Sequence, residues 1–201
     1  MNFKSITIVA DGSSDACLVP IADWILRNAA TPYKIEFAKN LPPHAAGLRE
    51  RIKKALALYP CDILIVHRDV EKESIKRRRS EIEEATNKVQ KIVVMATPIR
   101  MTEAWLLIDE KAIRTAADNP NGGVNLSLPS LRQIEDHPNP KIALLDALRT
   151  ASELRGRRRD RFLPESRRHR VAELIEDYSK LRNFDAFKEF ESSLMSAVDG
   201  H

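Results

Sequence analysis

Several features that commonly mark the class of a protein are scarce or missing in this sequence. The 201 residues include only two cysteines, Cys17 and Cys61, and six glycines. Two such cysteines exclude a disulfide framework, and their surroundings suggest neither a zinc site nor a redox pair, so we expect both in the core. No apolar run approaches the roughly 20 residues that a membrane-spanning helix needs. A membrane partner is therefore not expected.

Two further absences narrow the class. The opening residues, "MNFKSITIVADG", lack the longer apolar core and the cleavage site of a secretory signal, which predicts a cytoplasmic protein. The turn after the first apolar run, "ADGSSD", matches neither the G-x-G-x-x-G nor the Walker phosphate loop. A phosphatase or nucleotide-handling enzyme of another α/β family is therefore less favoured than a nuclease or a binding subunit.

What is present is an ordinary globular composition, 43% hydrophobic and 31% charged. Strand patterns occupy residues 5–10, 33–40, 63–67 and 91–99, and helical patterns follow each of them at 14–29, 45–59, 73–89 and 101–117. This alternation predicts an α/β fold: a parallel sheet of about four strands flanked by helices, Rossmann-like in plan. The apolar run at 63–67 indicates a strand that is covered on both faces.

Strand patterns stop after residue 118. Residues 118–130 have the Asn, Gly and Pro content of a loop, and helical patterns return at 129–136, 140–154, 167–178 and 184–198. We therefore expect an α/β core over residues 1–118 and an all-helical C-terminal extension over 119–201. The extension contains a basic segment at 155–170.

Polar side chains follow three of the expected strands, where they would share one edge of a parallel sheet. The set consists of Asp11 and Asp15 after the first strand, His67, Asp69 and Glu71 after the third, and Arg100 and Glu103 after the fourth. If the first and third strands are neighbours, Asp11 and Asp69 approach each other. Two adjacent carboxylates repel unless a cation lies between them.

Oxygen ligands with open positions favour Mg²⁺ or Mn²⁺, which can polarise a phosphoryl oxygen and activate a bound water. His67, Asp69 and Glu71 would point the same way if the third strand stays extended that far. We therefore expect Asp11, His67, Asp69 and Glu71 as metal ligands, with Asp11, Asp69 and Glu103 as catalytic residues. For His67, a hydrogen-bonded histidine at a strand end is an equal alternative.

Basic residues are concentrated late in the chain. Residues 151–170 hold eight arginines against three acidic residues. The density favours a surface for phosphates or an acidic partner over a surface that serves solubility. The expected phosphate-binding residues are Arg68 and Arg100 near the sheet edge, and Arg157, Arg158, Arg159 and Arg168 in the basic segment.

The pattern over residues 5–145 resembles the small stand-alone TOPRIM-like proteins that are often found beside ATPase genes in bacterial defence loci. The matching stretches are "ADG", "HRD" and "PIRMTEAWLLID", and the "NPK" at 139–141 is similar to a recurring element of the group, which adds Lys141 to the phosphate-binding candidates. The resemblance implies a magnesium-dependent site that cuts or religates nucleic acid. It also implies an ATPase partner and a role in phage defence or repair.

Two positions depart from the family pattern. Asp11 stands where the family has a glutamate that acts as general acid or base, and His67 stands where it has the first aspartate of a metal-binding Asp-x-Asp pair. Histidine prefers softer metals than Mg²⁺, although Glu71 is available to supply the lost carboxylate. The alternative function is therefore a catalytically weakened binding or sensor subunit that docks on an ATPase or on nucleic acid. The oligomeric state is left open.

Overall fold

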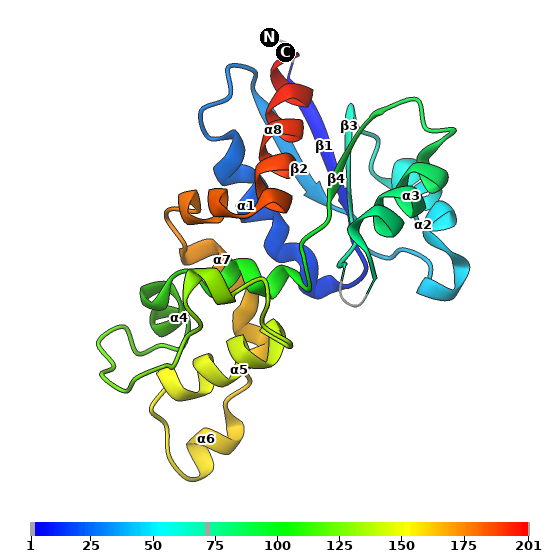
Figure 1. Ribbon diagram of the computed structural model, residues 1–201. Helices are drawn as coiled ribbons and strands as arrows, with labels where there is room; N and C mark the ends of the chain where they lie inside the picture. Colours follow the sequence, from blue (N-terminus) through cyan, green and yellow to red (C-terminus); the bar gives the residue numbers. More distant parts are fainter. Residues whose placement is uncertain (1–2, 71–72, 201) are drawn as a thin grey trace.

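The computed structural model describes residues 3–70 and 73–200 (Figure 1). Four parallel strands form one sheet in the order β2–β1–β3–β4: β1 (Lys4–Val9), β2 (Tyr33–Phe37), β3 (Ile63–His67) and β4 (Ile92–Ala96). Ile6 of β1 lies opposite Ile63 of β3, and His67 lies opposite Ala96 of β4. The expected α/β fold is confirmed, and β1 and β3 are neighbours.

Helices cover both faces of the sheet, which explains why all five side chains of β3 are buried. On one face, α1 (Leu18–Leu26) and α8 (Asp185–Asp199) pack against alternate residues such as Ile6 and Ile65. On the other face, α2 (Leu48–Leu58) and α3 (Ile75–Thr86) cover residues such as Leu64 and Val66 (Figure 1). The period of two along each strand thus divides the apolar residues between two cores.

The single helix expected at 101–117 is wrong: the structure has two shorter elements there. The 3₁₀ helix η3 (Thr102–Leu106) is followed by a break and then by α4 (Glu110–Ala116). The side chain of Asp109 accepts a hydrogen bond from the Ala112 backbone N–H at 3.0 Å and so starts a new helix. The bend lets Trp105 enter the core, where its ring lies 5.4 Å from that of Phe187 on α8.

The remaining residues form the expected helical part, with α5 (Pro140–Ala151), α6 (Arg157–Arg161) and α7 (Arg168–Leu174). The expected helix at 129–136 is only the short 3₁₀ turn η4 (Leu131–Gln133), and α6 was not predicted as a helix. Three other 3₁₀ turns are η2 (His44–Ala46), η5 (Pro164–Arg167) and η6 (Ser179–Asn183). One hydrophobic cluster runs from β1 through α4, α5 and α7 to α8.

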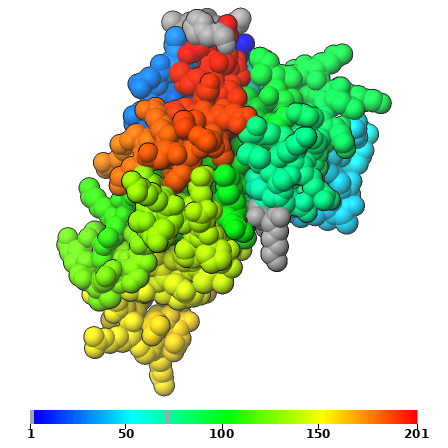
Figure 2. Space-filling model, viewed as in Figure 1, coloured from blue at the N-terminus to red at the C-terminus, as the bar shows by residue number. Residues whose placement is uncertain are grey.

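The overall shape has a projection at one end. The segment around α6 extends away from the sheet and from the rest of the helical part, and Figure 2 shows it in yellow as the tip of the molecule. In the part of the chain that the structure describes, no helix combines the length and the apolar character required to cross a membrane.

Candidate functional site

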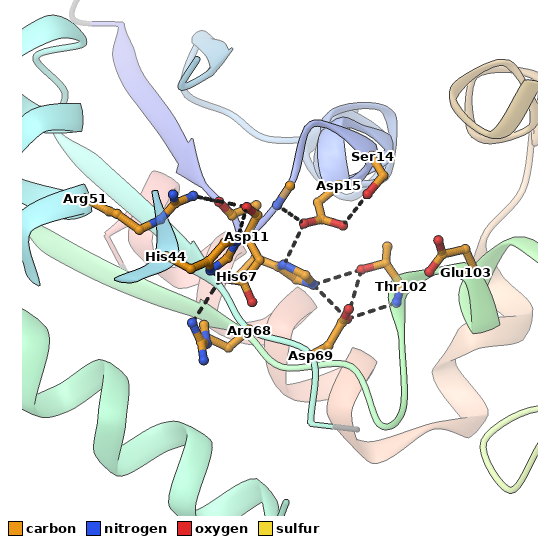
Figure 3. Close-up of polar contacts among 12 residues, drawn as sticks. Asp11, Ser14, Asp15, His44, Arg51, His67, Arg68, Asp69, Thr102 and Glu103 are labelled. Carbon is orange, nitrogen blue, oxygen red and sulfur yellow. Dashed lines mark hydrogen bonds and ion pairs between the residues drawn. The ribbon is translucent and has the colours of Figure 1, made fainter. Parts of the chain in front are cut away.

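The carboxyl ends of β1, β3 and β4 lead into one cluster of polar side chains (Figure 3). The loop after β1 carries Asp11 and enters the 3₁₀ helix η1 (Ser13–Cys17), β3 ends at His67, and β4 leads through residues 97–101 to Thr102. The chain moves from β2 on one side of β1 to β3 on the other, so this cluster lies at the topological switch point of the sheet.

His67 is the centre of this cluster and is fully buried. Its Nε2 lies 3.1 Å from Oδ1 of Asp69 and 2.8 Å from Oγ1 of Thr102, and its Nδ1 lies 3.7 Å from Oδ2 of Asp15. The Thr102 backbone N–H donates to the same Asp69 oxygen at 3.1 Å, and the Gly12 N–H donates to Asp15 Oδ2 at 2.8 Å. The imidazole therefore joins the loop after β1, the end of β3 and the start of η3.

The surroundings of His67 affect its pKa in opposite directions. Burial lowers the pKa, but the hydrogen bond to Asp69 and the negative charges of Asp69, Asp15 and Asp11 outweigh burial, and the net shift is upward. The position thus favours an imidazolium ion that compensates neighbouring carboxylates.

Asp11 has different partners on the other side of the cluster. Its Oδ1 accepts a hydrogen bond from Arg68 at 3.0 Å, and the same guanidinium contacts Glu81 of α3 at 3.0 Å. The buried side chain of Arg51 donates to the backbone oxygens of Ala10 and Asp11 at 2.6 and 3.2 Å, which fixes the loop after β1. Arg68, expected to bind phosphate, is thus held between two carboxylates of its own chain.

Glu103, expected to be catalytic, pairs with Arg168, expected to bind phosphate. Their Oε1 and Nη1 atoms are 2.5 Å apart, and only 8% and 14% of the two side chains are exposed. The buried thiol of Cys17 has a raised pKa, because of burial first and then the charges of Glu103, Asp15 and Asp69. Cys17 is therefore a neutral core residue beside the acidic cluster, as the sequence predicts.

The expected metal ligands do not fit a hard divalent ion in the part of the chain that is described. Asp11 is paired with Arg68, Asp69 with His67 and Glu103 with Arg168. Within residues 3–70 and 73–200, no three His, Cys, Asp or Glu side chains form a group that suits a metal ion. Glu71 lies outside the described residues. The last residue of β3 is His67.

The basic segment divides into two parts that the sequence does not distinguish. Arg168 turns inward to pair with Glu103, while Arg167 and the exposed Arg170 lie 2.6 and 4.0 Å from Asp118. The other part, which we call the α6 arginine surface, is exposed and projects at the tip of the molecule. It consists of Arg155, Arg157, Arg158, Arg159 and Arg161. Among the described residues, none of these five forms an ion pair with a carboxylate, although Asp160 lies within the segment.

A hollow of about 340 Å³ adjoins the α6 arginine surface. Arg155 and Arg159 line it together with Arg149 of α5, and the acidic residue among its lining side chains is Glu153. The Oε1 atom of Glu153 accepts the Val124 backbone N–H at 3.1 Å, and Arg149 pairs with Asp146 at 3.0 Å, so Arg155 and Arg159 are the lining arginines without an ion pair among the described residues. Guanidinium groups of this kind can bind phosphate oxygens.

The two remaining predicted phosphate-binding residues lie in different parts of the fold. Arg100 lies at the sheet edge, in the loop between β4 and η3, and has a left-handed backbone at φ 70°. Lys141 is exposed at the start of α5 in the helical part, as Figure 1 shows for that helix. The structure therefore does not bring the predicted phosphate-binding residues to a single surface.

Sequence reasoning missed the roles of Thr102 and Arg51 and gave Asp15 no assigned role. Asp15 does carry a signal, because an acid that follows Asp11 by four residues in a polar turn is well placed for the same sheet edge. Thr102 offers only a hydroxyl group next to Glu103, which is a weak indication of a role in the site. Arg51 lies inside an amphipathic helix pattern, and nothing in the sequence marks its contact with a loop 40 residues earlier.

Comparisons with family models, with curated proteins and with solved structures find no match.

Proposed function

We propose that this chain is a nucleic-acid-binding subunit that engages phosphates through the α6 arginine surface and does not cleave them. The observation that carries the proposal is the contrast in charge compensation. Arg68 and Arg168, which lie at the sheet edge, are paired with acids of the same chain, whereas the arginines of the α6 arginine surface are exposed at a projecting tip. Guanidinium groups in such a position bind phosphates and release counterions from nucleic acid.

The salt dependence of binding tests this proposal. We expect fluorescence anisotropy with labelled single- and double-stranded oligonucleotides to give a Kd of about 10⁻⁴ to 10⁻⁶ M at physiological salt, the range of sequence-independent binding. The variant R157A/R158A/R159A should bind all sequences more weakly. The slope of log K against log salt should become shallower by about one for each phosphate that the variant no longer neutralises.

A matched control separates this surface from net charge. The variant K53A/K54A/R77A removes the same number of positive charges from exposed positions on α2 and α3. It should bind nearly as tightly as the wild-type chain, with an unchanged slope. Equal losses of affinity in both triple variants, or no binding by the wild-type chain, would contradict the proposal.

A metal-dependent nuclease is the second candidate. One observation favours it: the stretches after β1, β3 and β4 bring Asp11, Asp15, Asp69 and Glu103 to one sheet edge (Figure 3). Incubation of DNA and RNA with the chain in Mg²⁺ or Mn²⁺ decides between the two functions. Cleavage that disappears in D69N would establish the nuclease, whereas binding without cleavage supports the proposed subunit.

A further inference from the structure

The space between Asp15 and Asp69 is filled by one side chain. The two ring nitrogens of His67 face different carboxylates, Nε2 at 3.1 Å from Asp69 Oδ1 and Nδ1 at 3.7 Å from Asp15 Oδ2 (Figure 3). The ring is fully buried, and within the described residues Nδ1 has no hydrogen-bond partner although it points at the Asp15 carboxylate. The ring thus separates the two carboxylates and forms a hydrogen bond to Asp69 but not to Asp15.

The ring is fixed in that position from several sides. Thr102 Oγ1 lies 2.8 Å from Nε2 of His67. The backbone N–H of Thr102 donates to the same Asp69 oxygen that contacts the ring. Asp15 is held in turn by the Gly12 N–H and by the Ser14 hydroxyl, at 2.8 and 3.3 Å. Because β3 ends at His67 and pairs there with Ala96, the backbone beneath the ring is also part of the sheet. A rotation of the ring would break several of these interactions at once.

A divalent ion makes a geometric demand that this arrangement does not meet. Mg²⁺ binds oxygen at about 2.0–2.1 Å, so two carboxylate oxygens that share one ion lie within about 4.2 Å of each other. The imidazole ring of His67 lies between Asp15 and Asp69 instead. Both carboxylates contact it on opposite nitrogens.

We infer that His67 occupies the position that a metal ion would take in this cluster. The carboxylates of Asp15 and Asp69 would otherwise form a site for a divalent cation, and the imidazole ring closes that site. The wild-type chain then binds no Mg²⁺ or Mn²⁺ at this edge. Replacing His67 by a carboxylate opens the space and brings three carboxylates around one point. The inference is independent of the α6 arginine surface and of nucleic-acid binding.

Manganese titration followed by electron paramagnetic resonance tests the inference directly, because free and bound Mn²⁺ are distinguished without any activity assay. We expect no saturable binding by the wild-type chain. H67D should bind one ion per chain with an affinity at least about tenfold above that of the wild-type chain, because affinity follows the number of charged ligands. The double variant H67D/D69N should lose this gain.

H44D is the matched control, since it makes the same substitution at the same sheet edge. His44 contacts the backbone oxygen of Asp11 at 2.7 Å and the Asp11 carboxylate at 3.7 Å, so H44D also adds a carboxylate beside an acid of the cluster, but His44 does not lie between Asp15 and Asp69. It should not gain Mn²⁺ binding. An equal gain in H44D would show that added negative charge alone explains the result, and would overturn the inference.

Folding of each variant is checked by far-ultraviolet circular dichroism. If H67D does not fold, H67N removes the ring with no added charge, and it should show a smaller gain that D69N cancels. The wild-type titration decides the question by itself: stoichiometric Mn²⁺ binding that disappears in D69N would overturn the inference. A folded H67D chain without a gain would also overturn it.

Discussion

Removal of Arg168 should strongly destabilise the fold, because Arg168 compensates a buried carboxylate. Only 6% of Glu103 is exposed, and its Oε1 lies 2.5 Å from the Arg168 guanidinium. The substitution R168M keeps an apolar stem but leaves the Glu103 carboxylate in the interior without its cation. Removal of one partner from a buried pair typically costs about 3–5 kcal/mol, because the remaining charge has lost both water and its counter-ion.

The size of this effect is measurable in urea. With an m-value of about 2 kcal/mol/M, a loss of about 3–5 kcal/mol lowers the midpoint of unfolding by about 1.5–2.5 M. The assay is equilibrium unfolding followed by circular dichroism, with coincident fluorescence of the two tryptophans as a check of two-state behaviour. The loss is a large fraction of the total stability of an ordinary domain, about 5–15 kcal/mol.

Two control variants test whether the uncompensated buried carboxylate causes the loss of stability. R167M breaks the neighbouring pair with Asp118, in which 29% and 54% of the side chains are exposed, and it should cost less than about 1 kcal/mol. E103M/R168M removes both charges and should recover most of the stability lost in R168M. Equal midpoints for R168M and R167M, or a double variant no better than R168M, would refute the argument from buried charge.

Three further predictions concern other buried polar groups. Folding raises the pKa of His67, so the stabilising effect of this residue is complete below the unfolded pKa of about 6.5 and disappears as the pH rises through the folded pKa. The difference in unfolding free energy between the wild-type chain and H67Q should therefore be larger near pH 6 than near pH 9. A difference that grows with pH would contradict this prediction. The pKa values of Cys17 and Cys61 are raised mainly by burial, so Ellman's reagent should label neither thiol in the native chain and both after unfolding; rapid native labelling would show that one is accessible. Y178F removes a buried hydrogen bond to the Ala172 carbonyl of 2.7 Å and should cost about 1 kcal/mol in urea unfolding, whereas an unchanged midpoint would mean that the bond contributes nothing.

The sheet was predictable because each strand carries its own local signal. The apolar run at 63–67 coincides with β3, and the alternation at 33–40 contains β2. The break between η3 and α4 was not predictable from periodicity, since "TEAWLLIDEKA" keeps a helical spacing of apolar residues throughout. There a single cap at Asp109 and the packing of Trp105 determine the backbone.

The candidate site was predictable as a place but not as a set of side-chain pairs. Parallel topology brings the residues after β1, β3 and β4 to one edge, and this follows from element order alone. Which cation compensates which carboxylate depends on partners far away in the sequence, such as Glu81 for Arg68 or Arg168 for Glu103. The same dependence separates the arginines that are paired with acids, such as Arg167 and Arg168, from the α6 arginine surface.

The position of α8 has a consequence for how the chain is made. This helix supplies Phe187, Phe190 and Leu194 to the cluster that covers one face of the sheet, and it contacts β4 and α1, which are synthesised long before it. A ribosome that has produced only the strands and α1–α7 therefore holds a nascent chain in which α1 covers this apolar sheet face only in part. We expect stable folding to wait until residues 185–199 have left the exit tunnel, and chaperones to be needed most during that interval.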